Sequence, residues 1–319
     1  MSVALHYDRR MLDHRPPPGH PEKPERLETV LRHLKRTGLL DVCPAGAVRE
    51  ATDDELRRVH SPAYLAALAE LERRGGGRIE ADTWTSSGSF LAARLAAGAA
   101  IEAVDAALTA DGPARAMALV RPPGHHALPG GGMGFCVYSN VAVAALEALA
   151  RHEANRVLVV DFDVHHGNGT QEAFYESERV AFLSVHRHPF YPGTGMKDET
   201  GAGPGLGFTR NLPLPLGTPP AELRAAFRAS LHDLADKHRP ELVVVSAGFD
   251  AMAEDPVGGL GLDFEDFDRL TRDVVEVADV QARGRIVSVL EGGYNPALLA
   301  GCVEVHLKAL GASAASDRV

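Results

Sequence analysis

Metal-ligand side chains gather in residues 157–170, which read VLVVDFDVHHGNGT. Four apolar residues typical of a buried parallel strand come first, but a protein core does not need the two aspartates, two histidines and asparagine that follow. Asp163 and His165 stand two residues apart on an extended segment, so their side chains point the same way and are able to bind one ion. The segment therefore predicts part of a metal site.

A third ligand must come from another strand. Asp250 is the carboxylate that directly follows the apolar run ELVVVSAGF. Two carboxylates and one imidazole suit an open Zn²⁺ site that keeps a coordination position for water or substrate, although these ligand types also admit Fe²⁺ or Mn²⁺. A closed structural zinc site favours cysteine. The three cysteines, Cys43, Cys136 and Cys302, lie outside the two segments that carry these ligands, and none of them has C-x-x-C spacing. We therefore expect one catalytic ion and no disulfide framework.

Two adjacent histidines, His125 and His126 in RPPGHHALPGGGMGFC, offer the proton transfer that a metal hydrolase needs. Asp161 has the same strand parity as the first ligand and could orient one histidine, whereas Asn168 could bond the other without adding charge. Tyr294, after EGG, offers a phenol that could polarise a carbonyl opposite the metal. The competing interpretation places the histidines on a surface loop and gives the tyrosine a structural role.

The elements that would position these side chains are alternating strands and helices. Strand-like runs fall at residues 2–7, 114–120, 156–162, 180–186, 241–248 and 285–291. Helical patterns fall at residues 24–38, 62–74, 88–110, 138–152, 220–238 and 264–284. This alternation predicts a parallel sheet with helices on both faces. Three segments rich in glycine and proline are expected to be surface loops: residues 15–24, 73–78 and 192–208.

The polar clusters share one position in this arrangement. Each begins where an apolar run ends, as RPPGHHA, DFDVHHGN, HRHPFYPG, GFDAMAEDP and EGGYN show. Ligands bind at the carboxyl ends of strands in open parallel sheets. A single cluster could be capping or turn chemistry, but the convergence of all of them predicts one active site.

Composition and charge exclude several classes of protein. The 319 residues are 45% hydrophobic and 24% charged, as in a globular protein, and no linker interrupts them, so we expect a single domain spanning residues 1–319. The formal net charge of -10 disfavours nucleic acid and suits a basic peptide or a polyamine. No signal peptide and no window of about 18 apolar residues is evident, so we expect a soluble, cytoplasmic protein with no membrane partner.

The motifs resemble those of a known enzyme family: RPPGHHA, DFDVHHGNGTQEAFY, LSVHRHPFYPGTG, SAGFDAMAEDP, LEGGYN and the early GHPEKPERLETVLRHL. From about His6 to Leu307, their order and spacing are similar to those of the zinc-dependent histone deacetylases and their bacterial relatives, among them acetylpolyamine amidohydrolases. The resemblance implies the arginase/deacetylase fold, a three-layer α/β sandwich around an eight-stranded, mainly parallel sheet. It also implies zinc-dependent hydrolysis of an acylated amine. Asn168 and HRHPFYPGTG are class II-like.

The resemblance implies roles for the catalytic residues. The zinc ligands would be Asp163, His165 and Asp250. His126, partnered by Asn168, would be the general base and then the general acid, and His125, paired with Asp161, would be the electrostatic histidine. Tyr294 would grip the substrate carbonyl. A buried monovalent cation, K⁺ or Na⁺, would be bound by Asp161, Asp163, His165 and Ser184.

The resemblance also implies a narrow tunnel for an unbranched alkyl chain. Phe135 and Tyr191 would be its aromatic walls, so one wall carries a hydroxyl, and Gly134 precedes the first of them. The other substrate-binding positions implied are a further tunnel residue, a rim aspartate that could hold the substrate backbone and an arginine near an internal acetate cavity: Val257, Asp82 and Arg26.

Two enzymatic functions and one binding function remain open at this stage. A deacylase of acyl-lysine in proteins or peptides is favoured, because Val257 stands where polyamine-selective eukaryotic relatives have a glutamate. The alternatives are an amidohydrolase for small acetylated amines and a catalytically silent acyl-lysine binding module. Met252 stands where arginases have a further carboxylate for a second Mn²⁺, so we expect no second metal there. The sequence leaves the acyl group and the oligomeric state open.

Overall fold

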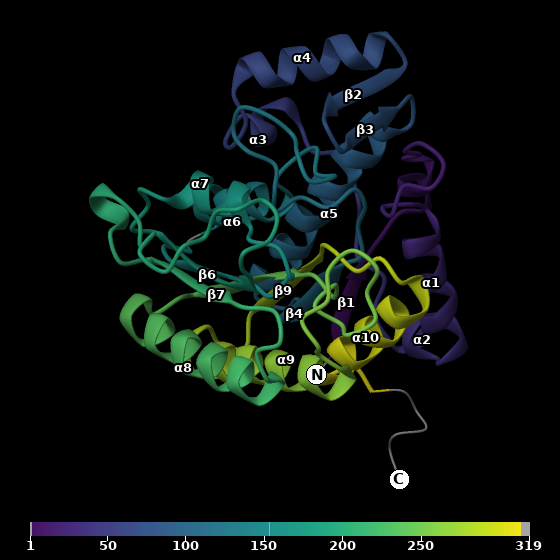
Figure 1. The fold of residues 1–319 in the computed structure, drawn as a ribbon. Helices are drawn as coiled ribbons and strands as arrows, with labels where there is room; N and C mark the ends of the chain where they lie inside the picture. The colour runs from purple at the N-terminus through teal and green to yellow at the C-terminus, as the bar shows by residue number, and fades with distance from the viewer. Residues whose placement is uncertain (1, 153, 314–319) are drawn as a thin grey trace.

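A computed structural model of the chain describes residues 2–152 and 154–313. The principal sheet runs through the centre of the molecule (Figure 1) and all its strand pairs are parallel. In spatial order its strands are β1 (Val3–His6), β4 (Arg115–Ala118), β9 (Ile286–Leu290), β8 (Leu242–Ala247), β5 (Val157–Asp161), β6 (Val180–Arg187) and β7 (Thr209–Leu214). Both ends of the chain thus contribute to one sheet.

Helices cover both faces of the sheet, as predicted, and complete a three-layer sandwich (Figure 1). One face carries α5 (Ser89–Leu108), α6 (Asn140–Arg151) and α7 (Asn168–Phe174). The other face carries α8 (Pro220–His238), α9 (Phe264–Gln281) and α10 (Pro296–Ala309), with α1 (Glu25–Arg36) packed on α10. Shorter elements complete the described fold: η1 (Arg9–Asp13), α2 (Leu39–Val42), α3 (Asp53–Leu56), α4 (Pro62–Arg73), the antiparallel hairpin β2 (Gly76–Glu80) and β3 (Thr83–Ser86), and η2 (Gly203–Gly205).

The principal sheet has seven strands among the described residues, where eight were expected. Beyond β1, the place of a further edge strand is taken by a single parallel bridge between Leu5 and Ala45. Leu5 N donates to Pro44 O at 2.9 Å and Gly46 N donates to Leu5 O at 2.7 Å. Pro44 has no N–H with which to extend this ladder on its own side of the bridge.

The three central strands β9, β8 and β5 bring the predicted segments to one edge. Every residue of these strands is buried, because both faces of the sheet are covered by helices. Asp161, the last residue of β5, is in register with Ser184 of β6 and Ser246 of β8. The segments that follow the three strands therefore begin at the same level. No helix in the described ranges is both long and apolar enough to cross a lipid bilayer.

Candidate active site

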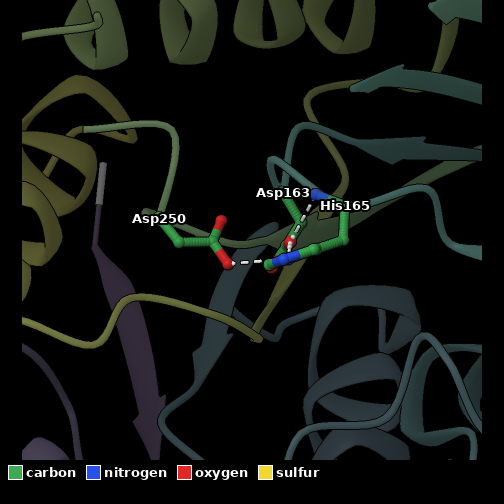
Figure 2. A group of neighbouring side chains, drawn as sticks. All are labelled: Asp163, His165 and Asp250. Atoms are coloured by element: carbon green, nitrogen blue, oxygen red, sulfur yellow. Dashed lines mark hydrogen bonds and ion pairs between the residues drawn. The ribbon is translucent and has the colours of Figure 1, made fainter. Parts of the chain in front are cut away.

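Asp163, His165 and Asp250 converge just beyond the carboxyl ends of β5 and β8 (Figure 2). One ligand atom from each lies within 4.8 Å of the others, and all three residues are buried. His165 Nδ1 is 3.0 Å from Asp163 Oδ1 and 3.1 Å from Asp250 Oδ2. The neighbouring His166 points elsewhere, since its ring nitrogens bond Thr194 and Gln171. Because side chains alternate in direction along an extended chain, His165 faces this cluster and His166 does not.

The donor set fits a divalent cation. Burial and the adjacent Asp163 carboxylate raise the pKa of Asp250 to about 7. Burial opposes protonation of His165, but the two carboxylates outweigh it and raise the pKa of His165 to about 9. Two buried carboxylates that face one imidazole need a positive charge between them. Glycine keeps the cluster open, because a Cβ at Gly248 would lie 2.0 Å from Asp163 Oδ2.

The dihistidine segment between β4 and α6 lies beside this cluster. The rings of His125 and His126 are 4.0 Å apart, and that of His126 is 5.7 Å from His165. His125 Nδ1 donates to Asp161 Oδ2 at 3.0 Å, and His126 Nδ1 donates to Asn168 Oδ1 at 2.7 Å. All five side chains are thus brought together as the sequence predicted.

The two histidines differ in electrostatic environment. Burial opposes protonation of His125, but the carboxylates of Asp163 and Asp161 outweigh it and raise the pKa of His125 to about 10. Burial and the neighbouring His125 and His165 hold the pKa of His126 well below its usual value. His126 is therefore neutral at pH 7 with Nε2 free to accept a proton, while His125 carries a charge. Neighbouring titratable groups whose pKa values are shifted in opposite directions are typical of separate catalytic roles.

Tyr294 lies near the carboxylates of the metal cluster, in the segment that follows β9. The Arg26 guanidinium carbon is 4.9 Å from the centre of its ring, and the Phe135 ring meets it edge-on at 5.6 Å. Burial raises the pKa of Tyr294 well above its usual value, so the phenol remains a hydrogen-bond donor. Arg26 itself donates to Gly293 O, Glu291 O and Glu22 Oε1, and so connects α1 to the tyrosine segment.

Two of the predicted tunnel positions, Tyr191 and Gly134, lie against His126. The Tyr191 ring meets the His126 ring edge-on at 5.2 Å, and its buried hydroxyl has no partner among the described residues. Gly134 N donates to Asp82 Oδ1 at 3.1 Å, which links the β2–β3 hairpin to the segment that carries Phe135. Gly134 has φ +55°, and a Cβ there would lie 2.3 Å from His126 Cδ2. Only glycine allows this approach.

The remaining predicted residues lie around the same edge. Val257 N donates to Asp255 Oδ1 in the loop that follows Asp250. Ser184, at the register position of Asp161, is fully buried and its Oγ lies 2.9 Å from His186 Nδ1.

Two residues at the site were missed by the sequence analysis. The Phe190 ring stacks on the His165 ring at 5.1 Å, which restrains the imidazole. Glu291 Oε2 accepts from the backbone N–H groups of Gly124 and His125, so this buried acid holds the dihistidine segment. The rule that polar residues follow apolar strands applied to the EGGYN motif, and it could have identified Glu291.

Comparison with known proteins decides the family. A model described as the histone deacetylase domain matches residues 20–310. The chain belongs to the histone deacetylase family. It is similar to the HD domain of HDA15, a solved structure with a TM-score of 0.90 and 36% sequence identity that covers 97% of this chain and 88% of that one. This likeness confirms the arginase/deacetylase fold, and membership of the family makes the protein a hydrolytic deacetylase.

Relatives of similar identity include proteins named as histone deacetylases and a protein named as a polyamine deacetylase. A histone deacetylase-like amidohydrolase from Pseudomonas aeruginosa is 41% identical, with 89% of this chain and 75% of that protein covered. A polyamine deacetylase from Homo sapiens is 42% identical over 91% of this chain, but only 44% of its own length is covered. A probable deacetylase from Archaeoglobus fulgidus is 37% identical, with 92% and 82% covered. A chloroplastic histone deacetylase from Oryza sativa is 41% identical, with 66% of its own length covered.

Proposed function

We propose that the protein is a zinc-dependent amidohydrolase that removes acetyl or other short acyl groups from the side-chain amine of acyl-lysine in proteins or peptides. The observation that carries the proposal is the convergence of Asp163, His165 and Asp250 within 4.8 Å. A neutral histidine and a protonated tyrosine, His126 and Tyr294, lie near this cluster. Zinc is typical of the family, and the buried donor set fits it.

The metal would be held by His165 Nδ1 and by the carboxylates of Asp163 and Asp250. When bound, zinc supplies Lewis-acid polarisation of a carbonyl and lowers the pKa of bound water. His126 Nε2 accepts a proton from the attacking water and returns it to the leaving amine, while the Asn168 bond fixes the tautomer. His125 remains protonated beside Asp161 and stabilises negative charge in the transition state.

Tyr294 donates a hydrogen bond from its phenol O–H to the substrate oxygen as negative charge develops there. We assign the alkyl chain of the substrate to the space between Phe135 and Tyr191, with Val257 as a further wall. Asp82 Oδ1 is engaged with Gly134 N, so the second carboxylate oxygen is the one that would bind the substrate backbone.

We also infer that the chain forms a single deacetylase domain, because strands from both of its ends share one sheet. A structural K⁺ or Na⁺ bound by oxygens of Asp161, Asp163, His165 and Ser184 is part of the proposal. Its support is the alignment of Asp161 with Ser184 on adjacent strands, where both side chains are fully buried.

Small acetylated amines are the second candidate substrate class. The similarity to a human polyamine deacetylase favours them, and so does the net charge of -10, which attracts cationic molecules. The absence of a glutamate at Val257 favours acyl-lysine instead.

The test compares turnover of an acetyl-lysine peptide and acetylputrescine by the zinc-loaded protein, before and after chelation. We expect faster turnover of the peptide, loss of activity on chelation and recovery on addition of zinc. Preference for acetylputrescine would establish the second candidate. Peptide binding without turnover by protein that contains one zinc per chain would overturn both and indicate a binding module. Full activity after complete removal of metal would refute the metal assignment.

A further inference from the structure

One carboxylate outside the metal cluster, that of Asp255, bonds four backbone N–H groups. Asp255 Oδ1 accepts from Val257 N at 2.9 Å and from Gly258 N at 3.0 Å. Asp255 Oδ2 accepts from Tyr294 N at 2.6 Å and from Asn295 N at 3.3 Å. All four are backbone N–H donors, so this carboxylate joins two separate segments of the active site.

The local bonds and the long-range bonds of Asp255 have different explanations. An aspartate that accepts from residues two and three positions ahead makes an ordinary local turn, and such a turn needs no functional explanation. The bonds to Tyr294 and Asn295 cross 39 and 40 residues of sequence. They end on the backbone of the tyrosine that we assign to the substrate oxygen and on its neighbour, so local turn chemistry does not account for them.

The loop that carries Asp255 begins at a metal-cluster residue. Gly259 N donates to Asp250 O at 2.7 Å, and Asp250 Oδ1 accepts from Val164 N at 2.8 Å. The loop is therefore tied at one end to the cluster and, through Asp255, to the backbone of Tyr294. Two other bonds hold the residues before the tyrosine: Gly292 N donates to Asp163 Oδ2 at 2.9 Å, and Gly293 O accepts from Arg26. The bond from Tyr294 N to Asp255 is the one that holds the amide of the tyrosine itself.

We infer that Asp255 is a positioning residue that holds the Tyr294 backbone at a fixed distance from Asp250, so that phenol and metal act on the same substrate oxygen. The inference rests on the proposed function, because it takes Tyr294 as the group that contacts this oxygen. Asp255 itself does not contact the substrate. Its effect on the rate passes through the tyrosine, and that dependence separates positioning from general stabilisation of the loop.

A double-mutant cycle tests this dependence. In Asp255→Asn an amide NH₂ replaces one of the two acceptor oxygens, so at least one pair of backbone bonds is lost. We expect kcat for the acetyl-lysine peptide to fall about 10-fold to 100-fold with little change in KM, because small misplacements of a reacting group have effects of that size. Zinc content per chain should stay at the wild-type value. In a Tyr294→Phe background the same substitution should change kcat less than 2-fold. An equal fall in both backgrounds would overturn the inference.

Hydrogen–deuterium exchange gives a readout that does not depend on activity. In Asp255→Asn the amides of Tyr294 and Asn295 should exchange at least 10-fold faster than in the wild type, and unchanged protection would refute the inference. Asp263→Ala is the matched control, since Asp263 also accepts a backbone N–H, from Asp266 at the start of α9, without a bond to the tyrosine segment. This control should leave kcat and the exchange rates of the Tyr294 and Asn295 amides unchanged.

Two further results separate the possible failures. If Asp255→Asn does not fold, Asp255→Ser keeps an acceptor oxygen and enters the same cycle, with a smaller fall in kcat expected and the same criterion for refutation. If Tyr294→Phe alone retains wild-type kcat, the proposed role of the tyrosine fails, while the exchange data still decide whether Asp255 holds its backbone.

Discussion

The substitution Glu22→Gln should destabilise the protein strongly, because Glu22 joins two buried arginines that support the active site. Glu22 Oε1 accepts from Arg121 Nε at 2.9 Å and from Arg26 Nη1 at 3.2 Å. Glu22 Oε2 accepts from Arg121 Nη2 at 2.8 Å and lies 3.2 Å from His14 Nε2. All four side chains are buried. Arg121 opens the RPPGHH motif and Arg26 contacts Tyr294, so the cluster connects both catalytic segments.

The expected magnitude follows from the burial of these charges. Removal of one partner from a buried ion pair costs about 3–5 kcal/mol, because the remaining charge is left without compensation. Glutamine keeps one acceptor oxygen but directs an NH₂ group at a guanidinium, so we expect the free energy of unfolding to fall within that range. At about 2 °C per kcal/mol for a large domain, Tm should fall by roughly 6–10 °C.

The pH dependence has a definite sign. Burial alone would raise the pKa of Glu22, but Arg121, His14 and Arg26 hold it well below its usual value of 4.5. A depressed folded-state pKa gives stability that is fully present above the unfolded-state pKa and is lost as the pH falls below it. The stability of the wild type should therefore fall more steeply than that of Glu22→Gln as the pH decreases below about 4.5.

Urea unfolding of both proteins at pH 7 and at several acidic pH values measures these effects. Glu265→Gln is the matched control, since Glu265 pairs with Arg269 on the exposed side of α9 and should contribute less than about 1 kcal/mol. A loss below about 1 kcal/mol for Glu22→Gln, or equal losses for the two variants, would refute the assignment of a buried charge cluster.

Three other substitutions test the site. Tyr294→Phe should lower kcat about 10²–10³-fold with zinc content retained, and near wild-type turnover of an acetyl-lysine peptide would contradict the donor role. His126→Ala should lower kcat about 10²–10⁴-fold and change the pH–rate profile; an unaltered profile would exclude it as the proton acceptor. Gly248→Ala places a Cβ 2.0 Å from Asp163 Oδ2 and should lower zinc content as measured by elemental analysis, whereas Gly130→Ala, with no atom within 4 Å of its added Cβ, should not. Equal zinc content in the two alanine variants would contradict the steric argument.

Strong local patterns made the central strands and long helices predictable. The apolar runs of β5, β8 and β9 and the amphipathic pattern of α1 matched the expected ranges closely. Strand β7 was missed, because it lies at the sheet edge, where half-exposed residues and Pro213 weaken the apolar signal. The helix α10 was also missed, and residues 73–78, expected to form a loop, contribute to α4 and to strand β2. In β2, backbone pairing to β3 outweighs the low strand propensity of glycine.

Convergence of the site was predictable for a geometric reason. In a parallel sheet all carboxyl ends meet at one edge, so ligand-type residues at the ends of β5 and β8 had to lie close together. Side-chain parity added the assignment of His165, because His166 faces the opposite way. Contacts that depend on loop conformation were beyond this reasoning, as the stacking of Phe190 on His165 shows.

The acids around the site divide into two classes according to whether two of them share one imidazole nitrogen. Asp163 and Asp250 each direct an oxygen at the same imidazole nitrogen, an arrangement that calls for a cation. Glu22, Asp255 and Glu291 direct theirs at guanidinium or backbone N–H groups and so hold the catalytic segments in place. Residue type alone cannot separate these classes, since both consist of carboxylic acids. Loss of an acid of the first class should lower zinc content and kcat together, whereas loss of one of the second should lower kcat or stability while zinc remains bound.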